Sequence, residues 1–80
     1  MAGHATVLYF ASLRDAAGIV SEEVAPEGNL HDLYQRLRDR HQFTWQSSQL
    51  RVAVDGAFAT WDDPVRPGSE VAFIPPVSGG

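Results

Sequence analysis

The closing stretch of the chain, Val71 to Gly80 (V-A-F-I-P-P-V-S-G-G), constrains the fold more than any other part of the sequence. Its first four residues are apolar and are followed by strand-breaking residues, so they predict a short buried strand at 71–74. Pro75 and Pro76 end this strand, because proline fixes φ and has no N–H to donate. Two glycines then form a very thin tip with a free carboxylate, which can enter a narrow channel on another protein. Ordinary fraying of a chain end is the alternative interpretation.

Length and composition exclude several classes of protein. Eighty residues suit one domain with a small core, because a chain of this size buries only roughly 60% of its unfolded surface. The absence of cysteine excludes disulfides, thiolate metal sites and cysteine nucleophiles. A net charge of −4 argues against nucleic acid and anionic membranes as partners, since both attract basic surfaces. No stretch is long enough to span a membrane and no signal peptide is recognisable, so we expect a cytoplasmic protein.

The remaining sequence predicts two helices and four more strands. The longer helix carries apolar residues at i, i+3, i+4 and i+7, which give it one apolar stripe. In chain order the first elements are a strand at 6–11, a short helix at 13–17 with Ser12 as its N-cap and Gly18 at its end, and a weaker strand at 19–25. The longer helix follows at 30–41, with Asn29 as its N-cap. A strand at 50–54 is then joined through Asp55-Gly56 to a hairpin partner at 57–60.

This order defines the fold class. One main helix packed across a mixed sheet, with the first and last strands as central neighbours, is the ubiquitin-like β-grasp, an α+β fold of two layers. The short helix after the first strand is an addition to that plan. We expect residues 1–74 to form the domain and residues 75–80 to form a flexible tail.

The strand at 6–11 is apolar on both faces, so both faces should be covered. The helix covers one of them. The other face would carry Phe10, Phe58 and Ile74, three large apolar side chains near the tail, which is typical of a partner-binding surface. Arg14 is a further candidate, as an exposed charge beside this patch. The alternative is that the three apolar residues are half-buried sheet packing.

No other group of residues suggests a catalytic or metal site. The three histidines, His4, His31 and His41, lack metal-ligand spacing and are interpreted as solvated, so no metal is expected. Asp62-Asp63 precedes a proline and is interpreted as turn chemistry. No glycine-rich phosphate loop is present, so we expect no bound cofactor, and any ATP would be held by a partner protein.

At the level of whole motifs, the chain resembles the small, sulfur-carrying subunits of molybdopterin synthase. The resemblance rests on V-L-Y-F-A-S-L-R-D-A-A-G at 7–18, on the Asp55-Gly56 hairpin and above all on P-G-S-E-V-A-F-I-P-P-V-S-G-G at 67–80. It covers essentially the whole chain. Carriers of sulfur for thiazole, tRNA or cysteine synthesis share the fold and the glycine pair, but usually lack the Pro-Pro-Val that precedes it here.

The resemblance implies a function for the tail. The Gly80 carboxylate, next to Gly79, would be adenylated by an E1-like adenylyltransferase that uses ATP, and a sulfur donor would convert it to a thiocarboxylate. The tail would enter the large subunit of molybdopterin synthase and donate sulfur to cyclic pyranopterin monophosphate, which forms the dithiolene of molybdopterin. The implied partner contacts are Phe10, Arg14, Phe58, Ile74, Pro75, Pro76, Val77 and Ser78.

This chain would contribute no catalytic side chain to the synthase, and the complex would be a heterotetramer of two small and two large subunits. Three alternatives stay open: a sulfur carrier for another pathway, a ubiquitin-like modifier conjugated to lysines, or a plain β-grasp interaction module.

Overall fold

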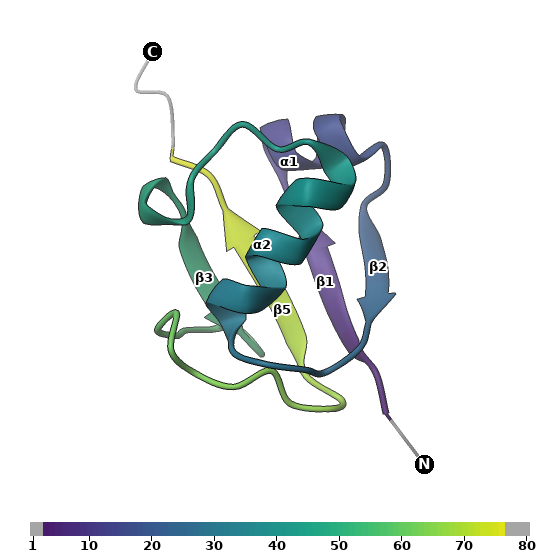
Figure 1. The fold of residues 1–80 in the computed structure, drawn as a ribbon, viewed down its shortest axis with the longest axis vertical. Helices are drawn as coiled ribbons and strands as arrows, with labels where there is room; N and C mark the ends of the chain where they lie inside the picture. The colour runs from purple at the N-terminus through teal and green to yellow at the C-terminus, as the bar shows by residue number, and fades with distance from the viewer. Residues whose placement is uncertain (1–2, 77–80) are drawn as a thin grey trace.

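The computed structural model describes residues 3–76, which form a five-stranded sheet, two α-helices and one 3-10 turn (Figure 1). The sheet order is β2-β1-β5-β3-β4. The central strands β1 and β5 are parallel, and the other neighbours are antiparallel. This confirms the predicted β-grasp fold. The elements are β1 (Ala5–Tyr9), α1 (Ala11–Ala17), β2 (Ser21–Val24), α2 (Leu30–His41), the 3-10 turn (Ser47–Gln49), β3 (Arg51–Val54), β4 (Ala57–Phe58) and β5 (Glu70–Ile74).

Helix α2 begins where the sequence predicts it. The Asn29 side chain accepts a hydrogen bond from the backbone N–H of Asp32, at 2.8 Å, and the Asp32 carboxylate accepts one from the backbone N–H of Asn29. This reciprocal capping box satisfies two N–H groups that the helix leaves unpaired. The helix ends at Gln42, which adopts the left-handed conformation.

The core lies between α2 and one face of the sheet. The predicted stripe of Leu30, Leu33, Tyr34 and Leu37 is fully buried. It packs against the strand residues that face the helix, which are Val7, Tyr9, Val52, Val71 and Phe73. Two aromatic residues of the loop after α2 also fold back onto the core: Phe43 is buried, and Trp45 packs against the core as a partly buried residue.

The short helix differs from its prediction. It begins at Ala11, immediately after β1, and Phe10 rather than Ser12 is its N-cap residue. The Ser12 hydroxyl instead accepts a hydrogen bond from the indole N–H of Trp45 at 2.9 Å. A contact across 33 residues has therefore replaced the local capping interaction. Gly18 ends the helix in the left-handed conformation, as predicted.

Four predicted strands are shorter in the structure, and the strands predicted at 19–25 and 57–60 lose the most residues. β2 begins at Ser21, which pairs with Leu8 of β1. The backbone N–H of Tyr9, at the end of β1, donates a hydrogen bond to the carbonyl of Val20 at 2.9 Å. Ile19 and Val20 lie outside the ladder and are exposed. β4 has only two residues in the ladder, Ala57 and Phe58, each paired with a residue of β3.

The interpretation of the histidines as solvated is wrong for His41. Its side chain is only 14% exposed, and its Nε2 lies 2.8 Å from Glu22 Oε2. The other oxygen of Glu22 accepts a hydrogen bond from Arg40, at 2.8 Å. The pair joins the end of α2 to the edge strand β2, a non-local contact that the spacing of the histidines does not reveal.

The Tyr9 hydroxyl is buried beside this ion pair and has no hydrogen-bond partner among the described residues. Burial, followed by the charge of Glu22, raises the pKa of Tyr9 well above its usual range. The folded chain therefore keeps the proton at pH values where the unfolded chain has lost it. Through this linkage, stability is lost as the pH rises above the unfolded value of about 10.

Replacement of this tyrosine tests the effect of the unpaired hydroxyl. Tyr9→Phe removes a buried donor without removing the ring, so the free energy of unfolding at neutral pH should stay within about 1 kcal/mol of wild type or rise. The loss of stability above pH 10 should become smaller. Urea unfolding at pH 7 and at pH 11 measures both effects. Destabilisation of several kcal/mol at pH 7 would show that the hydroxyl has a partner.

Candidate functional site

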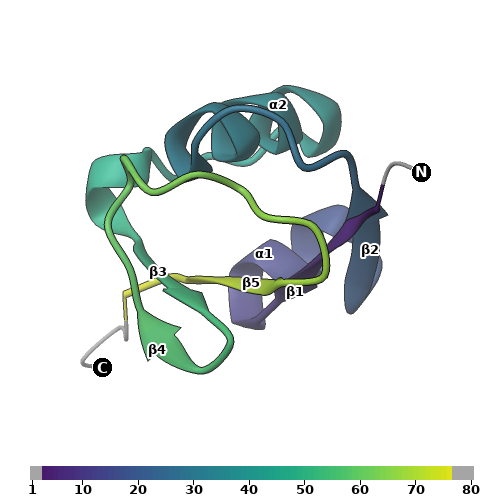
Figure 2. The same ribbon diagram turned by 90° about the horizontal axis from the view of Figure 1, so that it is seen from below.

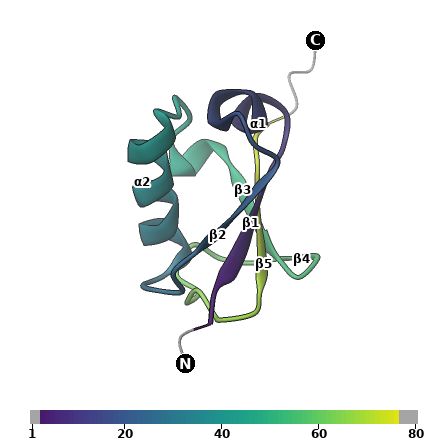
Figure 3. The ribbon, with the colours of Figure 1, turned by 90° about the vertical axis from the view of Figure 1, so that its right-hand side faces the viewer.

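The face of the sheet opposite α2 carries the predicted partner-binding residues. Figures 2 and 3 show α2 on one side of the sheet, while none of the described elements lies over the other side. Alternation along the strands turns Leu8, Ala53, Ala72 and Ile74 toward this open face, since their neighbours in sequence face α2. We call it the open face.

Phe10, Phe58 and Ile74 meet on the open face, as predicted. They line one groove of about 300 Å³ together with Leu8, Ala53, Gly56, Glu70 and Ala72. Phe10 is 45% exposed and Phe58 is 70% exposed. Large aromatic side chains left this accessible are not needed for the core, and an apolar groove of this kind is typical of a protein interface.

A second groove lies where the tail leaves the domain. It is lined by residues from the start of α1, from the loop before the 3-10 turn and from the end of β5, namely Phe10, Ala11, Ser12, Trp45, Ile74, Pro75 and Pro76. Phe10 and Ile74 belong to both grooves, so the apolar surface continues from the open face to the root of the tail.

Trp45 forms one wall of this second groove and is fixed at both ends. Its indole N–H donates to Ser12 on α1, and its backbone carbonyl accepts a hydrogen bond from the Tyr34 hydroxyl at 2.7 Å. The apolar ring and the satisfied N–H give the indole a defined position. The position of Trp45 in a polar loop of the sequence gives no sign that its ring lies beside Pro75 and Pro76.

The other predicted site residues are Arg14 and the tail at 75–80. Arg14 is exposed on α1, and its backbone N–H lies 3.4 Å from the carbonyl oxygen of Phe10. Pro75 is buried against its own domain, whereas Pro76 is exposed. The predicted carrier residues Gly79 and Gly80, and the predicted contacts Val77 and Ser78, lie outside the described residues. The division into a domain at 1–74 and a tail at 75–80 therefore stays a prediction.

The titratable residues in the described part of the chain form no metal site. Within residues 3–76, no three histidine, aspartate or glutamate side chains are grouped so that they could hold a metal ion. The carboxylate of Asp63 accepts a hydrogen bond from the backbone N–H of Thr60 at 3.1 Å, which confirms its interpretation as turn chemistry. No described helix has the length and apolar character needed to cross a membrane. The two grooves are apolar surfaces, and Pro75 and Pro76 line the second of them.

Comparisons with known proteins agree with this geometry. The model of the ThiS family matches residues 7–80. The molybdopterin synthase sulfur carrier subunit of Escherichia coli is 36% identical over 78 residues, which cover 92% of this chain and 96% of that protein. The crystal structure of SAMP1 from Haloferax volcanii has a TM-score of 0.78 at 26% identity and covers 98% of this chain and 100% of that one. Urm1 from Trypanosoma brucei, at 20% identity, shares the fold with a TM-score of 0.72, over 99% of this chain and 97% of that one.

The fold thus defines a ubiquitin-like β-grasp protein. More particularly, the chain belongs to the ThiS family of sulfur-carrier proteins.

Proposed function

We propose that this chain is the sulfur-carrying small subunit of a molybdopterin synthase. The observation that carries the proposal is the continuous apolar surface that runs from Phe58 across the open face to Pro76. It lets a partner bind beside the tail and receive the tail in its own active site. The similarity to the Escherichia coli sulfur carrier subunit supports the choice of this partner.

The chemistry of the proposed cycle takes place on the Gly80 carboxyl group. A carboxylate is a poor acyl donor, so an E1-like adenylyltransferase joins it to the α-phosphate of ATP and releases pyrophosphate. Hydrosulfide supplied by the sulfur donor then attacks the acyl carbon and displaces AMP, which gives a thiocarboxylate. This thiocarboxylate donates its sulfur to cyclic pyranopterin monophosphate in the large subunit, and two such transfers complete the dithiolene.

In this cycle the chain is a carrier and its side chains supply no acid, base or nucleophile. ATP belongs to the activating enzyme, and the pyranopterin belongs to the large subunit. The domain contributes binding and orientation: Pro75 and Pro76, at the root of the tail, line one groove with Phe10 and Trp45, and the open face is presented to each partner in turn. We further propose that it works in the cytoplasm in a complex of two small and two large subunits.

Reconstitution tests the proposed function. The chain, converted to its thiocarboxylate, is mixed with the large subunit from the same organism and cyclic pyranopterin monophosphate. Molybdopterin should form at up to one molecule per two thiocarboxylates consumed. The chain with an ordinary carboxylate is the control and should give no product. Absence of molybdopterin from the thiocarboxylated chain, while the large subunit is active with another carrier, would contradict the proposal.

A charge on the open face should prevent assembly without unfolding the domain. Phe58→Glu places a carboxylate in the apolar groove, and we expect binding to the large subunit to weaken by at least about 100-fold, as for a lost hot spot. Because Phe58 is 70% exposed, the midpoint of thermal unfolding should hardly change. Titration calorimetry and circular dichroism measure the two effects. Phe10→Glu should behave in the same way; an unfolded variant would show that the residue belongs to the core.

A second candidate function is that of a protein modifier. It is favoured by the similarity to SAMP1, since small archaeal modifier protein 1 is the name of that neighbour. Here the activated Gly80 would be attacked by lysine amines of target proteins. The chain itself has only arginine as its basic residue and so offers no lysine as an acceptor. Isopeptide-linked adducts of Gly80 in cell extracts would favour this function over sulfur transfer.

A further inference from the structure

The register of the strands divides the open face into three rows of side chains. At the end far from the tail, Glu70 of β5 is paired with Thr6 of β1, which is also paired with Glu23 of β2. Asp55 adjoins this row, because its carboxylate accepts a hydrogen bond from the backbone N–H of Glu70 at 2.9 Å. We call these residues the acidic row. The middle row is apolar and consists of Leu8, Ala72, Ala53 and Phe58.

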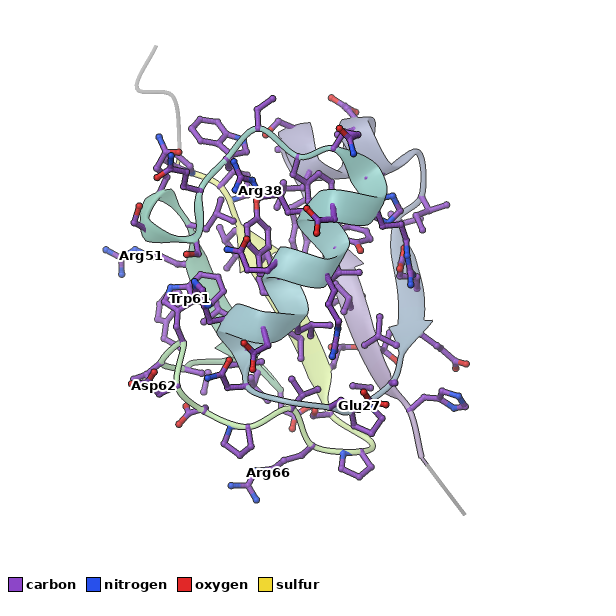
Figure 4. The ribbon with its side chains drawn as sticks, in the orientation of Figure 1. Glu27, Arg38, Arg51, Trp61, Asp62 and Arg66 are labelled. Atoms are coloured by element: carbon purple, nitrogen blue, oxygen red, sulfur yellow. The ribbon has the colours of Figure 1, made fainter. Side chains whose placement is uncertain are left out.

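The row beside the tail carries the opposite charge. Ile74, the last residue of β5, is paired with Arg51 of β3. The Arg51 guanidinium carbon lies 5.6 Å from the centroid of the Phe58 ring, so the cation covers part of the exposed aromatic. Figure 4 shows the Arg51 side chain projecting from β3 away from the body of the domain.

The Arg51 guanidinium is available to a partner. Among residues 3–76, the only carboxylate within salt-bridge distance of an arginine or histidine is that of Glu22, on the other side of the sheet, so no described carboxylate neutralises Arg51. A guanidinium offers five N–H donors in a fixed plane and binds carboxylates in a bidentate manner. Arg14 is also exposed, in the helix α1 that follows Phe10.

We propose that this polarity selects the partner and sets its orientation on the open face. The inference rests on the proposed function and takes the large subunit of the synthase as the partner. Its docking surface has an apolar ridge that fills the groove, a carboxylate that meets Arg51, and cationic side chains that meet the acidic row.

The charges are needed because apolar burial has no direction. The apolar ridge of the large subunit would fit the groove almost equally well after a half-turn in the plane of the face. That half-turn would point the tail away from the partner's active site. In the reversed orientation Arg51 would meet the partner's cations and Glu70 its carboxylate. Like charges held together cost several kcal/mol at an interface, so the reversed complex is rejected.

Charge reversal at Arg51 is the first test. The affinity of the chain for the large subunit is measured by titration calorimetry at low and high salt, and thermal unfolding confirms that each variant is folded. Arg51→Glu should weaken binding about 10- to 100-fold at low salt, and less at high salt, where charges are screened. Glu70→Arg should act in the same direction. Arg66→Glu is the matched control, because Arg66 is exposed in the loop at the far end of the domain (Figure 4) and should stay within about twofold of wild type.

The outcomes separate the inference from the function on which it rests. If Arg51→Glu binds within twofold of wild type while Phe58→Glu does not bind, the large subunit uses the apolar groove without the charge polarity, and the inference is wrong while the proposed function stands. An equal loss in Arg51→Glu and Arg66→Glu would show a general charge effect and would also overturn the inference. If the wild-type chain does not bind the large subunit at all, the proposed function and the inference both fail.

Discussion

Deletion of Gly80 should abolish sulfur transfer and leave the domain as stable as before. In the proposed cycle the Gly80 carboxyl is the group that is activated, and the length of the tail sets its distance from the docked domain. Removal of one residue shortens an extended chain by about 3.4 Å. Since a displacement of about 1 Å in an active site can cost about 100-fold in rate, we expect at least that loss in molybdopterin formation.

The same variant separates binding from chemistry. It keeps the open face and the tail root, so its affinity for the large subunit should fall far less than its activity. Addition of a glycine after Gly80 is the matched control in the opposite direction and should also reduce activity. Wild-type activity of the deletion variant would contradict the assignment of Gly80 as the carrier.

Phe73→Ala should destabilise the domain more than any change on the open face. Phe73 is completely buried in the central strand β5, with its ring centroid 5.2 Å from that of Tyr34 and 5.8 Å from that of Trp61. Truncation of a buried phenylalanine costs about 3–5 kcal/mol. A domain of this size has only about 4–12 kcal/mol of stability, so a large fraction of the variant should be unfolded at 37 °C.

Phe58→Ala is the matched control, because it removes the same atoms from the opposite face of the sheet. Phe58 is 70% exposed and loses mainly its contact with Arg51, so the free energy of unfolding should fall by less than about 1 kcal/mol. Urea denaturation of both variants gives the comparison. Equal destabilisation would mean that the open face is part of the core.

Local patterns in the sequence were sufficient to predict the fold and the open face of the sheet. The cap at Asn29 and the stripe of α2 involve residues within two turns of one another, and the structure confirms both. The open face could also be predicted, because alternation alone places Phe10 and Ile74 opposite residues that face the helix. No knowledge of strand register was needed for these predictions.

The parts that could not be predicted depend on contacts between distant residues. Ser12 has the local pattern of an N-cap, but its hydroxyl instead accepts a hydrogen bond from the indole N–H of Trp45. The half-buried pair of His41 and Glu22 joins residues from a helix and an edge strand. Arg51 is beside the tail only because β3 pairs with β5 in one particular register. Such registers depend on the packing of the whole sheet, not on neighbours in sequence.

The central claim is that Gly80 carries sulfur, and one measurement tests it most directly. The protein is isolated from cells together with its partners, and the mass of its C-terminal peptide is determined. The C-terminal peptide is essential, because oxidation of Met1 changes the mass of the intact chain almost equally. We expect one oxygen of Gly80 to be replaced by sulfur in part of the population. A plain carboxylate, even after incubation with an activating enzyme, ATP and a sulfur source, would contradict the carrier function.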